Sequence, residues 1–523
     1  MGATGRPPGR LESIRRVDWR FLLPEAAFGT VVVMEPTDDA LLDGLEQVAG
    51  SVTTDGQAGD RQRPDLVVTI GPDDRGLRAA LGRVPGGGWI YVGSGRGRSR
   101  ARASLRQVAR AAEKGGLVDI RRSWHWPNEP SALEIVPLDD ERAIRLVLDR
   151  RRSGRSARLK AGLAMVARRL GVLDAIVPGW SVVARRPDGA VPGADGGAGL
   201  GDPIRAGLPD GPAAGVVLLT PRFRASRHVI GLVLRSDPDG LAAVVKVPRL
   251  PDDDGGIQRE GAALASAAAA GVPGVPSVIA LRGGPRPMLV ETALDGVVIG
   301  SPEIRARPAE LCDEVEAWTG ALAGTPDRSR VPFRQLYAPP LARISSQVGA
   351  HDVAPGPVAS AVEDATPDTI ARLVTRTAAI LESLGEVGLA VVLEHGDLAP
   401  PNLLRLRGGG LGVVDWEVAD PEGLPLGDLL FFASFVTIVL AAEDVDGRTS
   451  LMSPAAEPAV VRQAGALGIA EALIPALTLA MWARWADRQL TRFTDPSTLL
   501  GERLPVRHVR SWESAAARLD KAR

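Results

Sequence analysis

The sequence predicts an α/β, doubly wound N-terminal domain followed by an α+β region with two lobes. Three observations predict this order. Over residues 17–150, buried apolar runs alternate with helical patterns, which is typical of a parallel sheet with helices on both faces. From residue 215, three apolar runs are separated by short turns, and after residue 296 the pattern is helical. The length of 523 residues suggests two or three domains of about 150 residues each.

Residues 1–150 contain strand and helix candidates in alternation. The strand runs are TVVVMEP, DLVVTIGP and GGWIYVG, and the helical runs are DDALLDGLEQVA, RGLRAALGRV and ASLRQVARAAEKGG. Two further runs, VDIRRSWHW and ALEIVPL, are joined by the turn-forming PNEPS. They predict an antiparallel pair at the edge of a Rossmann-like sheet.

The end of this region resembles the class I S-adenosylmethionine-dependent methyltransferases, in which a terminal hairpin follows strands of the D-L-V-V and G-G type. The first strand should then be followed by a glycine-rich turn, but the sequence there is MEPTDDA, without a glycine. A degenerate methyltransferase-like domain with a structural or partner-binding role is therefore favoured. An active methyltransferase and a Rossmann-like domain with another ligand are the alternatives.

Residues 151–212 are predicted to be a basic helix and a linker. The run at 151–172 places apolar residues at helical spacing among many arginines, which predicts a helix with one packed and one solvated face. A peripheral contact with a membrane or a polyanion is the alternative. For the arginine-rich run from Arg96 to Arg110, a solvated face is favoured and a phosphate-binding patch is the alternative. The run has no interleaved aromatic residues that would support nucleic-acid binding. Residues 185–215 are rich in Gly and Pro, as in a linker.

The composition limits the compartment and the partners. The net charge of −1 gives no general reason to expect a nucleic-acid partner. The single Cys312 excludes an intramolecular disulfide and a multi-cysteine zinc site, and a buried helical position is predicted for it. The N-terminus shows no apolar segment of a secretory signal. The apolar run Leu429–Ala442 has 14 residues, fewer than the roughly 18 needed to span a bilayer. A cytoplasmic protein with a buried helix at this run is expected.

Residues 213–295 predict a small lobe. The runs GVVLLTPRF, HVIGLVLRS and LAAVVKVPRL indicate three strands, and VPGVPSVIAL and PMLVETALDG indicate a fourth and a fifth. Lys246 lies in the third strand. Because only four of the 62 basic residues are lysines, a lysine in this apolar run suggests a compact charge that reaches between phosphate oxygens.

The run IQREGAALASAAAAG predicts a helix that ends at Gly271. It places Glu260 in its first turns, where the carboxylate is predicted to pair with Lys246 and to hold it toward a nucleotide. Glu291 and Ala293, in the run ETALDG where the chain crosses to the next lobe, are assigned to the same nucleotide site.

The segments HGDLAPPNLL and LGVVDWE carry groups suited to phosphate chemistry. A carboxylate that orients or deprotonates a hydroxyl must face the acceptor, while an amide and a second carboxylate hold Mg²⁺ against phosphates. Asp397, Asn402 and Asp415 supply these groups. Pro400 and Pro401 stiffen the loop. The turn RGGG then predicts a hairpin that brings Asn402 and Asp415 to one end of two strands.

This motif set, H-G-D-L-x-x-x-N-L-L, V-V-D-W-E and a following G-D-L, resembles the aminoglycoside phosphotransferase and choline kinase-like family, which has the two-lobed protein-kinase-like fold. The resemblance covers residues 215–490. It implies the following roles: Asp397 as catalytic base, Asn402 and Asp415 as magnesium ligands, Lys246 as the phosphate-binding lysine, Glu260 as its partner, His395 as a support of the loop, and Asp428 as a brace of the loop or a cap of its helix.

The resemblance implies an ATP- and Mg²⁺-dependent small-molecule kinase that phosphorylates a hydroxyl of a sugar, an amino alcohol or a glycoconjugate precursor. The first turn of the small lobe, TPRFRASRHV, lacks a glycine-rich loop, so phosphate contacts there would fall to backbone amides and to Ser226 or Arg227. The H-R-D and A-P-E signatures of protein kinases are also missing, which favours a small acceptor. A nucleotide-binding pseudokinase or scaffold in envelope or natural-product assembly, and a bifunctional protein with an active methyltransferase, are the alternatives.

Residues 296–523 are predicted to be a helical large lobe. Trp482 and Trp485 lie three residues apart in a helical run, and packing in the core is their favoured role. The alternative is that their rings face an acceptor pocket and stack on a sugar or a cation.

Overall fold

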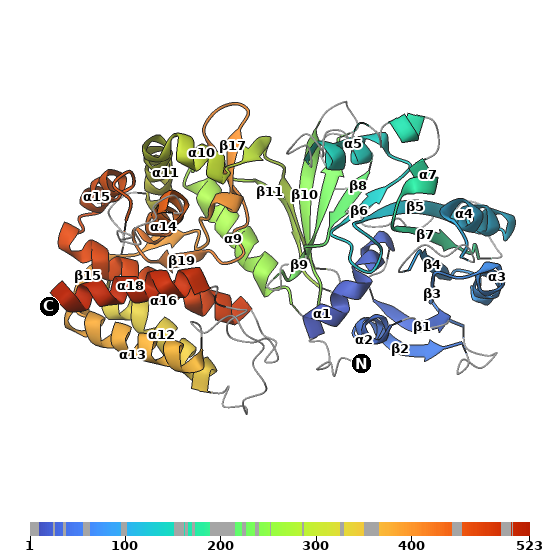
Figure 1. Cartoon of the computed structure of the whole chain (residues 1–523), viewed down its shortest axis with the longest axis horizontal. Coiled ribbons are helices and arrows are strands. Elements are labelled where there is room, and N and C mark those ends of the chain that lie inside the picture. Colours follow the sequence, from blue (N-terminus) through green and yellow to red (C-terminus); the bar gives the residue numbers. More distant parts are fainter. Residues whose placement is uncertain are drawn as a thin grey trace. The chain divides into compact units, whose positions relative to one another are not determined.

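In the computed structural model the chain forms two compact units, each of which is described by itself (Figure 1). Unit 1 comprises residues 1–254 and 279–293, and unit 2 comprises residues 255–278 and 294–523. The structure describes residues 10–24, 27–34, 38–55, 63–95, 102–150, 162, 166–169, 173–188, 215–221, 226–235, 240–250, 253–284, 287–324, 329–349, 366–441, 452–492, 504 and 506–522. The predicted basic helix at 151–172 and the predicted linker at 185–215 lie mostly outside these residues.

Unit 1 is built on a 12-stranded sheet with the order β11-β12-β10-β9-β8-β6-β5-β7-β4-β3-β1-β2. The strands are β1 (Phe28–Met34), β2 (Ala49–Thr54), β3 (Leu66–Ile70), β4 (Trp89–Gly93), β5 (Val118–Trp126), β6 (Glu134–Pro137), β7 (Trp180–Arg185), β8 (Val216–Leu219), β9 (His228–Leu234), β10 (Leu241–Pro248), β11 (Val278–Arg282) and β12 (Met288–Thr292). The helices are α1 (Arg10–Ile14), η1 (Arg15–Leu22), α2 (Asp39–Glu46), α3 (Asp74–Arg83), α4 (Leu105–Lys114), α5 (Glu141–Arg150) and α7 (Leu173–Ile176).

The sheet of unit 1 is mixed. Strands β2, β1, β3 and β4 are parallel, which the alternation of apolar and helical runs predicts for β1, β3 and β4, whereas β2 was not predicted. Strand β7, from the stretch predicted to be helix and linker, lies between β4 and β5 and is antiparallel to both. Strands β5 and β6 form the predicted antiparallel pair. They do not end the sheet, because β6 pairs with β8 of the predicted small lobe, with Ile135 opposite Leu218. The N-terminal and small-lobe strands therefore share one sheet.

Side chains alternate between two cores on the two faces of this sheet. In β1, Val32 and Met34 belong to the core that includes α3, α4 and α5, whereas Val31 and Val33 belong to the core that includes α1, η1 and α2. Both cores continue into the small-lobe strands: in β9, Leu232 belongs to the first core and Val233 to the second. Burial on both faces explains why these strands read as nearly continuous apolar runs.

Unit 2 is mainly helical. Its helices are α9 (Gly255–Ala269), α10 (Ser301–Ala306), α11 (Pro308–Ala323), α12 (Phe333–Gly349), α13 (Pro367–Leu381), η2 (Glu382–Leu384), η3 (Pro400–Asn402), α14 (Gly427–Ala441), α15 (Glu457–Ala466), η4 (Glu471–Leu473), α16 (Ile474–Arg492) and α18 (Val506–Ala522). Its strands are β13 (Gly296–Val298), β14 (Arg330–Pro332), β15 (Gly388–Ala390), β16 (Val392–Glu394), β17 (Leu403–Leu406), β18 (Leu411–Val413) and β19 (Asp420–Gly423). They form three small sheets, β13-β17-β18, β14-β15 and β16-β19.

The apolar helices of unit 2 are buried, as expected. Helix α14 buries residues 427–434, and Cys312 is buried in α11, where burial raises the pKa of its thiol to about 12. Trp482 and Trp485 are buried in α16, which agrees with core packing. Within the described parts of the chain, no single helix is long and apolar enough to cross a membrane, although the bent pair Glu457–Ala466 and Glu471–Thr491 meets that test of length and composition together.

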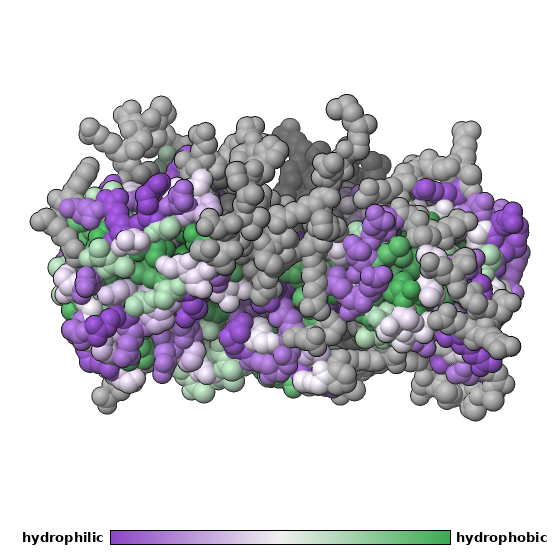
Figure 2. Space-filling model, turned by 90° about the horizontal axis from the view of Figure 1, so that it is seen from below, coloured by the Kyte–Doolittle hydropathy of each residue, from purple (hydrophilic) through white to green (hydrophobic). Residues whose placement is uncertain are grey.

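The surface mixes polar and apolar side chains. Figure 2 shows hydrophilic and hydrophobic residues interspersed on the face that it draws. The most exposed of the large hydrophobic residues in the described chain are Val297 (74%) and Val298 (53%), which are neighbours on the short strand β13. Two adjacent valines form too small a group to mark an interaction surface.

Candidate active site

The loop after β16 is held by His395. The backbone N–H of Asp397 donates to Nδ1 of His395 at 3.3 Å, and Nε2 of His395 lies 3.1 Å from the carbonyl oxygen of Val414. Because Nδ1 accepts a hydrogen bond, Nε2 must carry the ring proton and donate it to Val414. The buried imidazole thus links the backbone of Asp397 to the backbone of Val414, the residue directly before Asp415. These contacts are in line with the predicted supporting role of His395.

Asp428, at the start of α14, braces the same loop. Its carboxylate accepts the backbone N–H groups of His395 (2.7 Å) and Gly396 (2.8 Å). Burial, and after it the nearby charge of Glu394, raise the pKa of Asp428 to about 7, although the two backbone donors act in the opposite direction. The predicted structural role of Asp428 agrees with these contacts.

Gly396 is the one position of the loop that only glycine fits. Its φ is +83°, and a Cβ there would lie 2.8 Å from the carbonyl oxygen of Val418 and 2.9 Å from the guanidinium carbon of Arg488. The turn that presents Asp397 therefore depends on this glycine.

Asn402 is fixed by a bond to the backbone of Asp397. Its Nδ2 donates to the carbonyl oxygen of Asp397 at 2.9 Å. Since the amide nitrogen makes this bond, the amide oxygen is the atom that can bind a cation. The turn in between is closed by Ala399, whose N–H donates to Asp397 O at 2.7 Å and whose carbonyl accepts Asn402 N at 2.9 Å. The side chains of Asp397 and Asn402 are half-buried.

The predicted hairpin brings Asp415 to the same place as Asn402. Strands β17 and β18 are antiparallel, with Leu403 opposite Val413, and the N–H of Val414 donates to the carbonyl oxygen of Asn402 at 3.0 Å. Asp415 follows directly with a φ of +71°, in the left-handed region that a non-glycine residue rarely adopts. Such a conformation persists only where its surroundings enforce it, and such residues cluster at functional sites.

Trp416 supplies that enforcement. It is fully buried, its Nε1 donates to Val413 O at 3.1 Å, and its ring meets His395 edge-on with centroids 4.9 Å apart. Its backbone N–H donates to Oε1 of Glu260 at 2.8 Å, so the buried Glu260 of α9 fixes the chain next to Asp415. This contact of Glu260 was not foreseen from the sequence.

The predicted nucleotide residues Lys246, Glu291 and Ala293 lie in unit 1, whereas Glu260 lies in unit 2. In unit 1, Nζ of the buried Lys246 is 3.6 Å from Oε1 of Glu291, on the neighbouring strand β12. Ala293 directly follows β12. Within its unit Lys246 therefore pairs with Glu291, and the predicted pairing with Glu260 stays a prediction.

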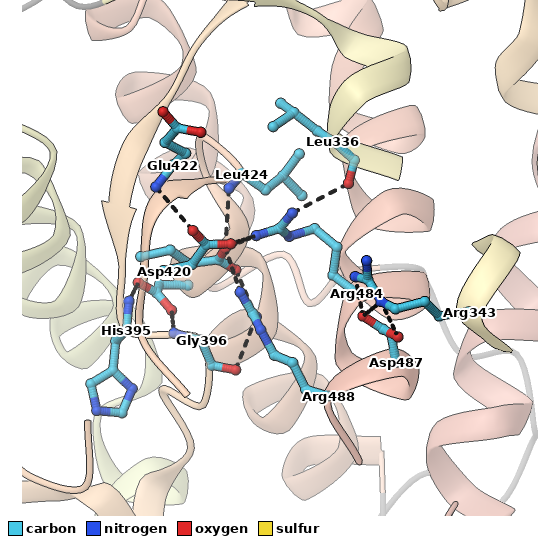
Figure 3. Close-up of polar contacts among 12 residues, drawn as sticks. Leu336, Arg343, His395, Gly396, Asp420, Glu422, Leu424, Arg484, Asp487 and Arg488 are labelled. Carbon is cyan, nitrogen blue, oxygen red and sulfur yellow. Dashed lines mark hydrogen bonds and ion pairs between the residues drawn. The ribbon is translucent and has the colours of Figure 1, made fainter. Parts of the chain in front are cut away.

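A buried ion network contacts the loop at Gly396 through Arg488 (Figure 3). Arg484 and Arg488, both from α16, converge on Glu394. Arg488 Nη1 and Nη2 lie 2.9 and 2.6 Å from its two oxygens, and Arg484 Nη2 lies 2.9 Å from Oε2. Arg484 also binds Asp420 at 2.7 Å, and Arg488 donates to the carbonyl oxygen of Gly396 at 3.1 Å. Burial alone would raise the pKa of Glu394, but the two arginines lower it to about 2.

This network was not predicted, although the sequence contains a signal for it. Arg484 and Arg488 lie four residues apart in the largely apolar run TLAMWARWADRQL, so they face the same side of a helix. Two arginines on one side of a buried helix require an acidic partner. In the structure Glu394, directly before His395, is the partner that both arginines share.

The donor set suits Mg²⁺. A carboxylate at Asp415 and an amide oxygen at Asn402 are hard oxygen ligands, and a cation held by two such groups keeps waters and phosphate oxygens as its other ligands. Among the residues that the structure describes, no group of three or more His, Cys, Asp or Glu side chains could hold a metal ion. That result is compatible with this pair, because the proposed site contains one carboxylate and one amide.

Comparison with known proteins defines the class of this part of the chain. Residues 232–446 match the model of a family described as "Phosphotransferase enzyme family". Residues 232–446, less than half of the chain, are therefore similar to a phosphotransferase family, which agrees with the motif resemblance of this region. The match leaves residues 1–231 outside it, and no curated protein matches the chain.

Several solved structures are similar to the chain. An ethanolamine kinase from Plasmodium vivax shares 11% identity with a TM-score of 0.38, over 58% of this chain and 81% of the kinase. An aminoglycoside phosphotransferase from Streptomyces rimosus shares 17% with a TM-score of 0.36, over 54% and 95%. The choline kinase LicA from Streptococcus pneumoniae shares 12% with a TM-score of 0.36, over 56% and 90%. Since these scores are low, the class of the region rests on the family match.

Proposed function

We propose that the protein is an ATP- and Mg²⁺-dependent phosphotransferase that transfers the γ-phosphate to a hydroxyl group of a small molecule. The observation that carries the proposal is the set of backbone links in unit 2 that joins Asp397, Asn402 and Asp415. A carboxylate beside an amide–carboxylate pair is the arrangement that phosphoryl transfer to a hydroxyl needs.

In this proposal Asp397 accepts the proton of the acceptor hydroxyl. The hydroxyl oxygen forms a bond to the γ-phosphorus, the bond from that phosphorus to the bridging oxygen breaks, and ADP leaves. Asn402 and Asp415 would hold Mg²⁺, which neutralises charge on the phosphates. Lys246, Glu291 and Ala293 are proposed to contact the nucleotide. The base contributes a factor of roughly 10² to 10⁴ to the rate, and positioning supplies most of the rest.

The acceptor is proposed to be a sugar, an amino alcohol or a glycoconjugate precursor. Proteins with similar structures include kinases named for ethanolamine and choline and a phosphotransferase named for aminoglycosides. Ethanolamine, choline and the aminoglycosides are all small hydroxylated compounds. We keep a cytoplasmic location as a prediction.

The test is ADP formation by the full chain with ATP, Mg²⁺ and a panel of hydroxylated amines, sugars and their conjugates. We expect turnover with a subset of the panel, and we expect Asp397→Asn to abolish it while ADP still binds in calorimetry. Turnover by Asp397→Asn at the parental rate would contradict the role of the base. ADP binding without turnover across the whole panel would favour a nucleotide-binding scaffold.

A further inference from the structure

The N-terminal segment of residues 10–22, formed by α1 and η1, is anchored in the N-terminal part of the unit 1 sheet. Arg16 binds the buried Glu129 with two hydrogen bonds (2.8 and 3.1 Å) and Asp38, the residue that caps α2, with a third (3.1 Å). Trp19 stacks on Tyr91 of β4 with centroids 3.6 Å apart. These contacts hold the segment in one place.

The same segment also reaches the strand that carries Lys246. Asp18 accepts Nε of Arg249 with both carboxylate oxygens at 3.1 Å, across 231 residues of sequence. Arg249 follows β10 directly, and its side chain is fully buried. Arg20 donates to the carbonyl oxygen of Arg249. Because a buried guanidinium without a counter-charge is strongly destabilising, Asp18 is what allows Arg249 to occupy this position.

The remaining nitrogens of Arg249 hold both ends of the connection between β8 and β9. Its Nη2 donates to the carbonyl oxygen of Pro221 at 2.9 Å, and its Nη1 donates to Ser226 Oγ at 3.0 Å and to the carbonyl oxygen of Ser226. Its backbone N–H donates to Arg227 O at 2.8 Å. The planar guanidinium, with five donors in a fixed arrangement, can satisfy these acceptors and Asp18 together, which a lysine cannot.

Arg249 and the groups that it binds (Asp18, Pro221 and Ser226) form a clamp. This clamp lies at the same end of the β9–β10 hairpin as Lys246. In the antiparallel pair β9–β10, His228 is opposite Pro248 and Ile230 is opposite Lys246. Ser226 and Arg227, for which phosphate contacts are predicted, thus enter β9 beside the strand end that carries Lys246. Arg227 is held in addition by Asp253 at 2.7 Å.

We propose that Arg249 is a positioning residue for nucleotide binding, and that Asp18 makes the N-terminal segment part of the nucleotide site through it. The proposal rests on the proposed function. It gives the N-terminal domain a role in phosphotransfer that requires no ligand of its own.

The test compares two variants of the clamp with a matched control in the full chain. Arg249→Lys keeps the charge beside Asp18 but loses the bonds to Pro221 and Ser226, and Asp18→Asn removes the charge without touching the connection. Glu129→Gln, the control, weakens a buried ion pair of the same N-terminal segment; Glu129 bonds Arg16 and Tyr91 rather than Arg249, Pro221 or Ser226. ADP affinity is measured by calorimetry, KM for ATP and kcat are measured in the acceptor assay, and circular dichroism establishes that each variant is folded.

We expect both clamp variants to weaken ADP binding and to raise KM for ATP about tenfold, and a tenfold change corresponds to roughly 1.4 kcal/mol of binding free energy. The change in kcat is expected to be less than about threefold. Glu129→Gln is expected to keep the parental ADP affinity. Parental affinity in Arg249→Lys, or an equal loss in all three variants, would overturn the proposal. Either result leaves the proposed function standing, since that is tested separately by the turnover of Asp397→Asn.

Discussion

The carboxylate of Asp428 accepts the backbone N–H of His395 at 2.7 Å, although the two residues are 33 positions apart. The second oxygen accepts the N–H of Gly396, so one side chain fixes two successive peptide groups directly before Asp397. The orientation of the proposed base is therefore set by a buried carboxylate on another helix.

Asp428→Asn is expected to lower kcat by roughly tenfold to a hundredfold with little change in KM for ATP. The amide of Asn has one acceptor oxygen, whereas the N–H groups of His395 and Gly396 each need an acceptor. The measurement is steady-state kinetics with an acceptor that the parent protein phosphorylates. Unchanged kcat in a folded Asp428→Asn variant would show that the brace does not position the base.

The pH dependence of stability gives a second test of Asp428. Its pKa of about 7 in the folded protein exceeds the unfolded value of about 3.9, so between these values the folded state holds a proton that the unfolded state has lost. This contribution to stability is present at low pH and is lost as the pH rises from about 4 to about 7. The thermal midpoint of Asp428→Asn should therefore fall less steeply than that of the parent over this range. Parallel curves would contradict the raised pKa.

Glu394 titrates in the opposite sense. Its pKa of about 2 lies below the value of 4.5 that is ordinary for Glu, so its contribution is present above about pH 4.5 and is lost as the pH falls toward 2. The contribution is on the order of 3 kcal/mol. Glu394→Gln leaves Arg484 and Arg488 buried without that charge, and it should destabilise unit 2 by about 3–5 kcal/mol at pH 7. A thermal midpoint close to that of the parent at pH 7 would exclude this role for the network.

Gly396→Ala should prevent the loop from forming as described. The positive φ and the short approaches to Val418 and Arg488 make the cost roughly 1–3 kcal/mol, and the loss of activity should exceed the loss of stability. Gly408→Ala is the control, since a Cβ there meets nothing within 4 Å. Equal kcat values for the two variants would argue against a strict requirement for glycine at 396.

The sequence was most informative where chemistry is local. The segment from His395 to Asp415 contains its own loop, turn and hairpin, so spacing alone predicts that Asn402 and Asp415 meet. The strands β8, β9 and β10 were likewise readable, because each is a short apolar run bounded by turn residues.

The missed features depend on pairs that are far apart in sequence. The bond between Asp18 and Arg249 spans 231 residues, and that between Glu394 and Arg488 spans 94. The pairing of β6 with β8 and the insertion of β7 are of the same kind, because hydrophobic periodicity shows that a strand forms but not which strand it joins.

We propose that Asp415 and Asn402 hold the magnesium ion of a phosphotransfer site, and the decisive measurement is calorimetric titration with ADP in the presence and absence of Mg²⁺. Mg²⁺ should tighten ADP binding by the parent and by the control variant Glu422→Gln, whereas Asp415→Asn should lose this enhancement and keep its Mg²⁺-free affinity. Full enhancement in Asp415→Asn would show that Asp415 does not hold the ion.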